Sequence, residues 1–187
     1  MSERVIVRNA RLAFIDLFEP KAFPGTDKKR YSASALVEKG SAADKAIWAA
    51  IKKVADEQWP KKGDAQVTAL KGDRGRFCYQ DGDNSDYETQ HGHMVLSSHR
   101  RAEDGAPKVK GLLKSQDLTG GEGIIYPGCY ANVHVDIYAQ EGQYKGIRCA
   151  LVGVQFVKDG QAFGGARRAT DDEFDDLEVP DDDEALT

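Results

Sequence analysis

The sequence predicts a mostly β fold, a small antiparallel barrel with one inserted α-helix and a disordered acidic tail. Alternating apolar and polar residues recur in several short segments, which is the period of half-buried strands. Only residues 41–59 have a helical period. Residues 164–187 contain too few apolar side chains to offset the entropy of ordering a chain. We therefore expect a folded domain at 1–165 and a disordered tail at 166–187.

The first two strands are predicted from alternation and from the turn residues between them. Residues 5–14 alternate with period two, and residues 31–37 return as a second strand. Residues 19–25 include two prolines and a glycine, so we expect a loop there, which the bases at 28–30 extend.

The helix is predicted from its cap and its apolar spacing. Ser41 and Asp44 have the spacing of a capping box, with Asp in place of the usual Glu. Pro60 ends the run, and Trp48 is expected at the margin of the core. The apolar residues at helical spacing are Ala43, Ile47, Ile51, Val54 and Ala55.

The remaining strands are less regular before residue 115 than after it. We expect strands at 74–79 and 93–98, followed by an exposed basic connection at 100–110. Clearer alternation predicts strands at 129–139 and 144–157. Asp159-Gly160 predicts a hairpin turn that leads into 161–163. One helix among about six strands in this order fits a five-stranded OB-like barrel best.

The charge is divided unevenly along the chain. The net charge is −5, but residues 169–187 contain ten acids and no Lys or Arg. The first 168 residues therefore hold 21 acids against 26 bases, a net charge of about +5. A basic body with an acidic string is typical of a nucleic-acid-binding domain with an interaction tail, and also of an unrelated domain with a solubilising tail.

Several signals for other functions fail. No apolar run is long enough to span a bilayer, and the N-terminus lacks a secretory signal, so we expect a cytoplasmic protein without membrane contact. Three widely spaced cysteines indicate buried free thiols, although a zinc site from Cys78, His91 and His93 stays open. The run from Asp81 lacks the glycine and glutamate of a calcium loop, and residues 119–123 lack the lysine of a phosphate loop. We expect no metal, no cofactor and no catalytic residues.

Bases stand next to aromatic residues in several segments. Binding unpaired strands requires basic side chains for the phosphates and aromatic faces for the bases. Phe77 is equally compatible with a core position, and Tyr31 with a sheet edge. The candidate nucleic-acid-binding residues are Lys28, Lys29, Arg30, Tyr31, Arg74, Arg76, Phe77, Tyr79, Arg100, Arg101, Lys108, Lys110, Tyr138 and Tyr144, with Lys145 and Arg148 adjacent to the last.

Four segments of the sequence resemble a known family. The segments 11–23 and 31–33, followed by 126–138 and 153–165, are similar in order to phage single-stranded DNA-binding proteins of OB fold, a family once catalogued as a domain of unknown function. The resemblance implies an OB fold, sequence-independent binding of single strands and a role in phage DNA replication or recombination.

The resulting hypothesis is a single-stranded DNA-binding protein that forms a homo-oligomer or coats DNA cooperatively. Its tail is expected to compete with DNA and to recruit replication or recombination proteins. The tail residues assigned to these contacts are Asp171, Asp172, Glu173, Asp181, Asp182, Asp183 and Glu184. The alternatives are a structural or adaptor protein that acts through protein contacts, and a DNA-processing enzyme such as a nuclease. Single-stranded RNA as the ligand also stays open, because stacking surfaces accept both nucleic acids.

Overall fold

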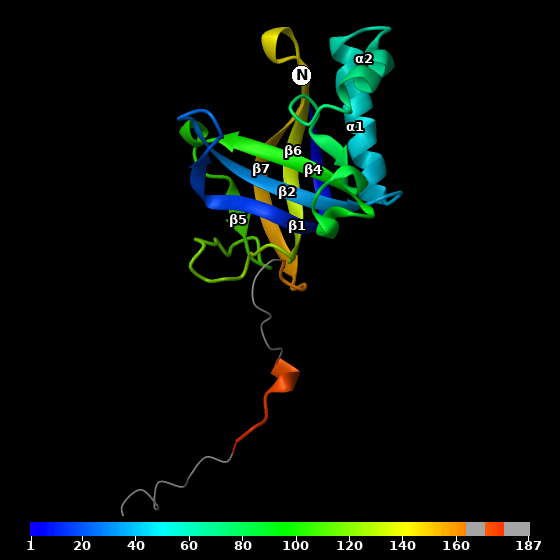
Figure 1. Ribbon diagram of the computed structural model, residues 1–187. Helices are drawn as coiled ribbons and strands as arrows, with labels where there is room; N and C mark the ends of the chain where they lie inside the picture. The colour runs from blue at the N-terminus through cyan, green and yellow to red at the C-terminus, as the bar shows by residue number, and fades with distance from the viewer. Residues whose placement is uncertain (164–170, 178–187) are drawn as a thin grey trace, which may run out of the picture.

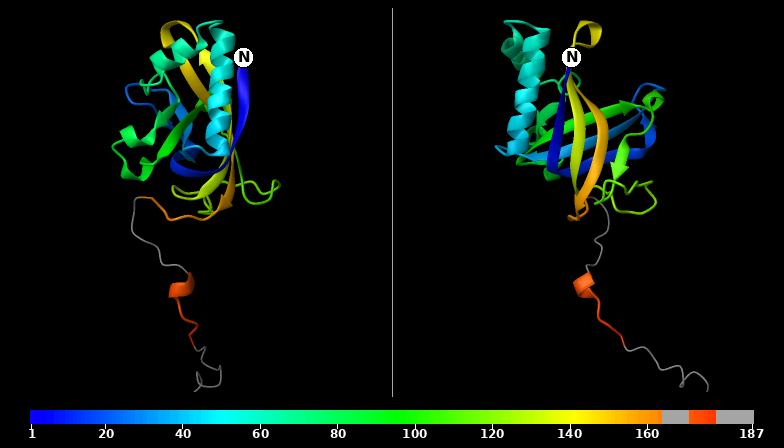
Figure 2. Two further views of the ribbon diagram at one scale, coloured as in Figure 1. Left: turned by 90° about the vertical axis from the view of Figure 1, so that its right-hand side faces the viewer. Right: turned by 180° about the vertical axis from the view of Figure 1, so that it is seen from behind.

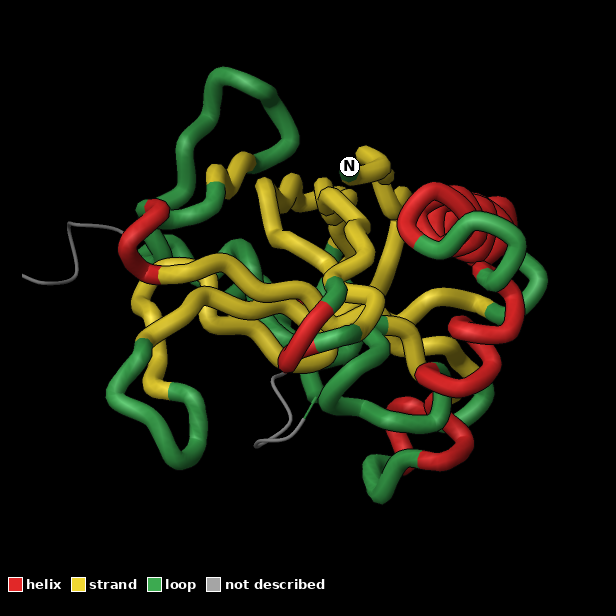
Figure 3. The backbone as a smooth tube through the Cα atoms, turned by 90° about the horizontal axis from the view of Figure 1, so that it is seen from above, coloured by secondary structure: helices red, strands yellow, loops and turns green. Residues whose placement is uncertain are grey.

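The computed structural model describes residues 1–163 and 171–177 (Figure 1). The strands are β1 (Ser2–Ala22), β2 (Lys29–Glu38), β3 (Tyr79–Asp81), β4 (His93–Arg101), β5 (Lys108–Lys110), β6 (Tyr130–Gln140) and β7 (Gly146–Lys158). The helices are α1 (Ala42–Gln58) and α2 (Gly63–Leu70). Both helices lie on one side of the strands, as the view from above shows (Figure 3).

The strands form the five-stranded barrel that the sequence predicted. The sheet order is β3-β4-β2-β1-β6-β7-β5, and an additional pairing of β4 with β7 closes the barrel. In chain order the five barrel strands are β1, β2, β4, β6 and β7, and this connectivity is consistent with the OB-like barrel. The pairings of β7 with β4 and with β5 are parallel, so the barrel that was predicted as antiparallel has parallel contacts at these two places.

The first strand is longer than the alternation indicated. β1 pairs with β6 through its first half and with β2 through its second half, and register shifts interrupt both ladders. Pro20, which was expected in a loop, lies in β1 at the shift between Asp16 and Lys21. A proline is tolerated there because an interrupted ladder does not require its missing N–H. The loop is therefore confined to 23–28, and Lys29 and Arg30 begin β2.

The long helix has the predicted cap and buries the predicted face. The backbone N–H of Asp44 donates to Ser41 Oγ at 3.2 Å, and the Asp44 carboxylate accepts from the N–H of Gly40 at 2.8 Å. α1 packs against β1 and β6 along the outside of the barrel (Figure 2, left). Trp48 is half-buried beside the rings of Phe77 and Tyr79, at the margin of the core as expected. The second helix, α2, was missed because it is only eight residues long and begins at Gly63.

The segment 74–79 is not the strand that its sequence indicated. Only Tyr79 enters β3, whereas residues 76–78 fill the space between β4 and β7. The N–H of Cys78 donates to the carbonyl of Ile147 at 3.0 Å, and the N–H of Ser97 donates to the carbonyl of Cys78 at 2.9 Å. This segment therefore belongs to the barrel wall without extending a ladder.

Two further segments also differ from the prediction. The connection expected at 100–110 is partly regular, because Arg100 and Arg101 belong to β4 and residues 108–110 form β5. Residues 161–163 do not form a returning strand. At Gly160 the chain passes close to the loop that contains Gly128, because a Cβ atom there would lie 2.2 Å from the Gly128 carbonyl oxygen. The chain therefore crosses this loop instead of running back along β7.

We expect Ser41→Ala to lower the free energy of unfolding by about 1 kcal/mol, because the N–H of Asp44 loses its acceptor. Urea denaturation measures the change. Ser115→Ala, at an exposed loop position, is the matched control and is expected to leave the midpoint unchanged. Equal midpoints for the two variants would show that the cap contributes nothing.

Candidate nucleic-acid interface

A cleft lies on the outside of the barrel, over the seam between β4 and β7. We call it the basic cleft; its volume is about 230 Å³. It is lined by Arg30, Arg74, Gly75, Phe77, Cys78, Ser97, His99, Arg101, Tyr138, Ile147, Arg148 and Cys149. Four arginines thus converge from β2, β4, β7 and the segment before β3.

The sheet register explains why these side chains meet. Arg30 lies directly opposite Arg101 in the β2–β4 ladder, so the two point to the same face. Tyr138 lies opposite Arg148 in the β6–β7 ladder. The pairing of His99 with Ala150 joins the two ladders and brings both arginine-bearing faces to one place.

The positive charge of the cleft is only partly compensated. Arg101 forms ion pairs with Glu103 and Asp104, both at 2.9 Å. Among residues 1–163 and 171–177, neither Arg30 nor Arg148 forms an ion pair with a carboxylate. Burial lowers the pKa of Arg30, and the charge of Arg148 lowers it further. An anion in the cleft would therefore relieve an unfavourable concentration of positive charge.

His99 sits inside this cluster as a neutral ring. Burial is the main cause that lowers its pKa from 6.5 to about 4, and the charges of Arg30 and Arg148 act in the same direction. His99 Nδ1 and Arg148 Nε are buried, and within the described residues neither atom has a hydrogen-bond partner. Such unsatisfied atoms are rare in folded proteins and indicate a place where a ligand or water binds.

Two loops around the cleft are held in place by Arg148. Arg148 donates to the carbonyl of Tyr144 at 2.9 Å and to that of Gly75 at 3.2 Å. Trp59 Nε1 donates to Glu141, which anchors the start of the same β6–β7 loop to the end of α1. Tyr144 is exposed in this loop, so its ring is available for stacking.

The β1–β2 loop presents a second exposed ring. Phe23 is 44% exposed, and the guanidinium of Arg30 lies 4.0 Å from its ring centroid. An OB fold usually binds nucleic acid on the face of its second and third barrel strands and on the loops after its first and fourth. In this barrel these are the face of β2 and β4, the β1–β2 loop and the β6–β7 loop. Phe23, Tyr144 and the pair Arg30–Arg101 occupy these positions.

The structure gathers some of the sequence-predicted residues and disperses others. Arg30, Arg74, Phe77, Arg101 and Tyr138 line the basic cleft, and Tyr144 is joined to it through Arg148. The remaining basic candidates lie outside the cleft lining: Lys28, Lys29, Arg76, Arg100, Lys108 and Lys110. Arg100 donates to the carbonyls of Asp104 and Gly105, and Lys110 is ion-paired with Asp117.

Three of the predicted aromatic residues are buried. Tyr31, Phe77 and Tyr79 have exposed fractions of 9%, 2% and 1%, so none offers a free ring face in this structure. The hydroxyl of Tyr79 donates to Asp44 at 2.7 Å, and burial together with this bond raises its pKa. Phe23 and His99 were absent from the candidate set, and Arg148 was named only as a neighbour of Tyr144. The alternation of residues along β4 and β7 places His99 and Arg148 on the outer face of the barrel. The sequence contains no pattern that predicts the parallel pairing of these two strands, so it could not show that the two residues meet.

The chain approaches the tail on the side of the barrel where β2 and β4 lie. Residues 158–163 run beneath the barrel toward that side (Figure 2, left). Phe163 packs against Ala13, Leu36 and Val95 on the outer face, and the guanidinium of Arg11 lies 4.0 Å from its ring centroid. Leu36 and Val95 are each six residues from Arg30 and Arg101 along the same strands, so all four share one face.

The acidic tail itself is described only in part. Asp171, Asp172 and Glu173 form a single 3₁₀ turn, where disorder was predicted. Asp181, Asp182, Asp183 and Glu184 lie outside the described residues, as does most of the segment predicted to be disordered.

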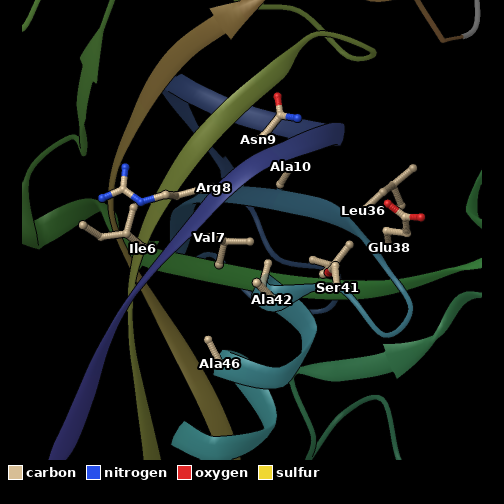
Figure 4. Close-up of a pocket in the computed structure, with 12 residues that line it drawn as sticks. Ile6, Val7, Arg8, Asn9, Ala10, Leu36, Glu38, Ser41, Ala42 and Ala46 are labelled. Carbon is tan, nitrogen blue, oxygen red and sulfur yellow. The ribbon is translucent and has the colours of Figure 1, made fainter.

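Other possible sites carry less chemistry. A hollow of about 350 Å³ beside the start of α1 is lined mainly by small and aliphatic residues, and Figure 4 shows its one base, Arg8, pointing away from the alanines of the helix. All three cysteines are buried free thiols, as expected. No group of His, Cys, Asp or Glu within the described ranges is arranged to hold a metal. No helix in that part of the chain is long and apolar enough to cross a membrane.

Solved structures of phage proteins share this architecture. The single-stranded DNA-binding protein of bacteriophage Enc34, in complex with ssDNA, aligns with a TM-score of 0.69 and 26% identity over 86% of this chain and 89% of that one. The single-stranded DNA-binding protein gp2.5 of bacteriophage T7 aligns with a TM-score of 0.56 over 97% of this chain and all of that one; its 14% identity shows a likeness of fold alone.

Sequence comparisons agree over nearly the whole chain. A putative protein, p50, of Acyrthosiphon pisum secondary endosymbiont phage 1 is 36% identical over 186 residues, which is 98% of both chains. The family model described as the ssDNA-binding protein of Enterobacter phage Enc34 matches residues 3–186. The chain therefore belongs to the Enc34 ssDNA-binding protein family.

Proposed function

We propose that this protein binds single-stranded DNA without sequence preference and protects it during phage DNA replication or recombination in the host cytoplasm. The observation that carries the proposal is the basic cleft, in which Arg30 and Arg148 have no carboxylate partner among the described residues. The likeness to a relative that was solved with ssDNA supports the same assignment.

The chemistry of the cleft fits a backbone-reading mode. Arginine side chains bind phosphates through charge-assisted hydrogen bonds that carry no sequence information. Tyr138 and the exposed rings of Phe23 and Tyr144 offer faces on which any base can stack. This mode of binding requires no metal, no cofactor and no catalytic step.

The acidic tail is proposed to compete with DNA for the same face. In support of this, Phe163 packs against Leu36 and Val95, on the strands that carry Arg30 and Arg101. Ten carboxylates on such a tether reach an effective concentration of about millimolar at the cleft. Once DNA displaces the tail, its acids become available to replication or recombination proteins. We also propose cooperative coating of the strand or a homo-oligomer.

The adaptor function remains the second candidate, because an acidic tail on a domain with sheet edges also suits protein contacts. The two candidates differ in their preference for single strands. A binding protein of the proposed kind prefers labelled oligo-dT to a duplex of the same length, whereas an adaptor shows no preference.

We expect Arg30→Gln to weaken oligo-dT binding and to reduce the slope of log K against log salt by about 0.7, because one phosphate contact is lost. Fluorescence anisotropy at several salt concentrations measures both quantities. Lys45→Gln removes the same charge from an exposed position on α1 and is the matched control. Equal slopes for the two variants would place the DNA elsewhere.

Removal of residues 169–187 is expected to tighten oligo-dT binding at low salt, because the competing carboxylates are lost. The difference is expected to disappear at high salt, where the tail is screened. A full-length variant with the ten acids replaced by Asn and Gln separates charge from chain length and is expected to behave like the truncated protein. Equal affinity of all three proteins at low salt would contradict competition by the tail.

The affinity for oligo-dT is expected to rise as the pH falls from 6.5 toward 4. The pKa of His99 is about 4 in the free protein, and phosphates beside Arg30 and Arg148 would raise it. The complex then binds more protons than the free protein, so binding strengthens with acidity. His99→Gln is expected to reduce the rise in affinity with falling pH, while any part of that rise caused by protonation of the tail carboxylates remains. Identical pH profiles for the wild type and His99→Gln would rule out His99 as the linked group.

A further inference from the structure

A second hollow adjoins the basic cleft along the same face of the barrel. We call it the aromatic pocket; its volume is about 300 Å³. It is lined by Phe14, Ser34, Arg74, Phe77, Gln80, Asp81, Ser85, Tyr87, Gln90, Val95 and Ser97. Arg74, Phe77 and Ser97 line both hollows, so the two form one continuous track.

The register places this pocket beyond the arginines on the same strands. Phe14 pairs with Ser34, and Ser34 pairs with Ser97, which makes one row across β1, β2 and β4. Ser34 and Ser97 are each four residues from Arg30 and Arg101, so this row shares their outward face. These strands cross the front of the barrel in Figure 1.

Two aromatic side chains remain exposed at this pocket. Phe14 is 47% and Tyr87 is 54% exposed, and their ring centroids lie 4.9 Å apart in an edge-to-face arrangement at 64°. An edge-to-face pair leaves ring surface free for a third planar group. Single exposed aromatics need no explanation, but a pair beside a basic cleft indicates a ligand with an aromatic face.

The loop that carries Tyr87 is held in place before any ligand arrives. Arg74 donates to the carbonyl of Asn84 at 2.9 Å, and the N–H of Tyr87 donates to Ser85 Oγ at 3.1 Å. Lys39 pairs with Asp81 at 2.7 Å, which compensates the negative charge of the pocket lining. A ring carried on a fixed backbone binds at lower entropic cost than one on a mobile loop.

We propose that the aromatic pocket binds a nucleobase of the same single strand whose phosphates occupy the basic cleft. This inference rests on the proposed function. A base stacks on the exposed ring of Tyr87 beside Phe14, while Gln80 and Ser97 offer polar atoms at the pocket wall. The bound strand therefore runs along the outer face of β2 and β4, from the seam with β7 toward the loop at 85–90.

The test uses full-length protein and oligo-dT with one abasic site moved along the strand. For the wild type, the abasic site is expected to weaken binding at one position more than at its neighbours. For Tyr87→Ala, binding of the intact oligonucleotide is expected to be about tenfold weaker, within the range for one lost stack, and that position-specific loss disappears. Tyr87→Phe keeps the ring and is expected to bind like the wild type. Leu112→Ala, at a side chain of similar exposure (65%) outside both hollows, is the matched control.

The outcomes separate this inference from the proposed function. Absence of wild-type binding to oligo-dT would overturn both. Tight wild-type binding with the same abasic profile in Tyr87→Ala would overturn the aromatic pocket alone. Photo-crosslinking of the wild type to 5-iododeoxyuridine decides the matter if Tyr87→Ala fails to fold. A crosslink at Tyr87 or Phe14 supports the pocket, and crosslinks confined to other segments overturn it.

Discussion

The parallel contact between β4 and β7 is the constraint on which the rest of the structure depends. The two strands pair at a single position, His99 with Ala150, and then diverge. Residues 76–78 fill the resulting gap with backbone hydrogen bonds to Ile147 and Ser97. Because the closure is so short, the wall of the barrel at this point is made partly of an irregular segment. The basic cleft lies over that segment.

The pairing of β4 with β7 also concentrates positive charge, which closing a barrel does not itself require. Strands that are distant in the sequence bring Arg30, Arg101 and Arg148 around one histidine. Among the described residues the cluster has few acidic partners, and His99 remains neutral because its pKa is lowered. Such an arrangement reduces the stability of the folded protein and is relieved by an anion, which is typical of a binding surface.

The outer face of β2 and β4 links the separate features of the molecule. Along this face, in order, lie the arginines, the serine row beside Phe14, and the apolar patch that Phe163 covers. The segment that precedes the acidic tail is attached to one end of the face. Phe163 and the arginines therefore lie on the same outer face of β2 and β4, which is the observation behind the proposed competition between tail and DNA.

The sequence by itself determined the local features of this protein and its family. The alternation of residues 129–157, the cap at Ser41 and the uneven charge depend on neighbours along the chain, so the barrel, the helix and a basic body with an acidic tail could all be predicted. The resemblance of ordered segments was enough to assign the family, which the match over residues 3–186 confirms.

Only the tertiary structure decided which basic and aromatic residues share a surface. Tyr31, Phe77 and Tyr79 stand beside bases in the sequence, yet they are buried, whereas Phe14 and Tyr87 carried no signal and are exposed as a pair. Proximity in the sequence does not specify which side of a strand faces the core when bulges shift the register, as they do in β1. The parallel seam is formed by segments about fifty residues apart, His99 and Ala150, and no local pattern encodes such a contact.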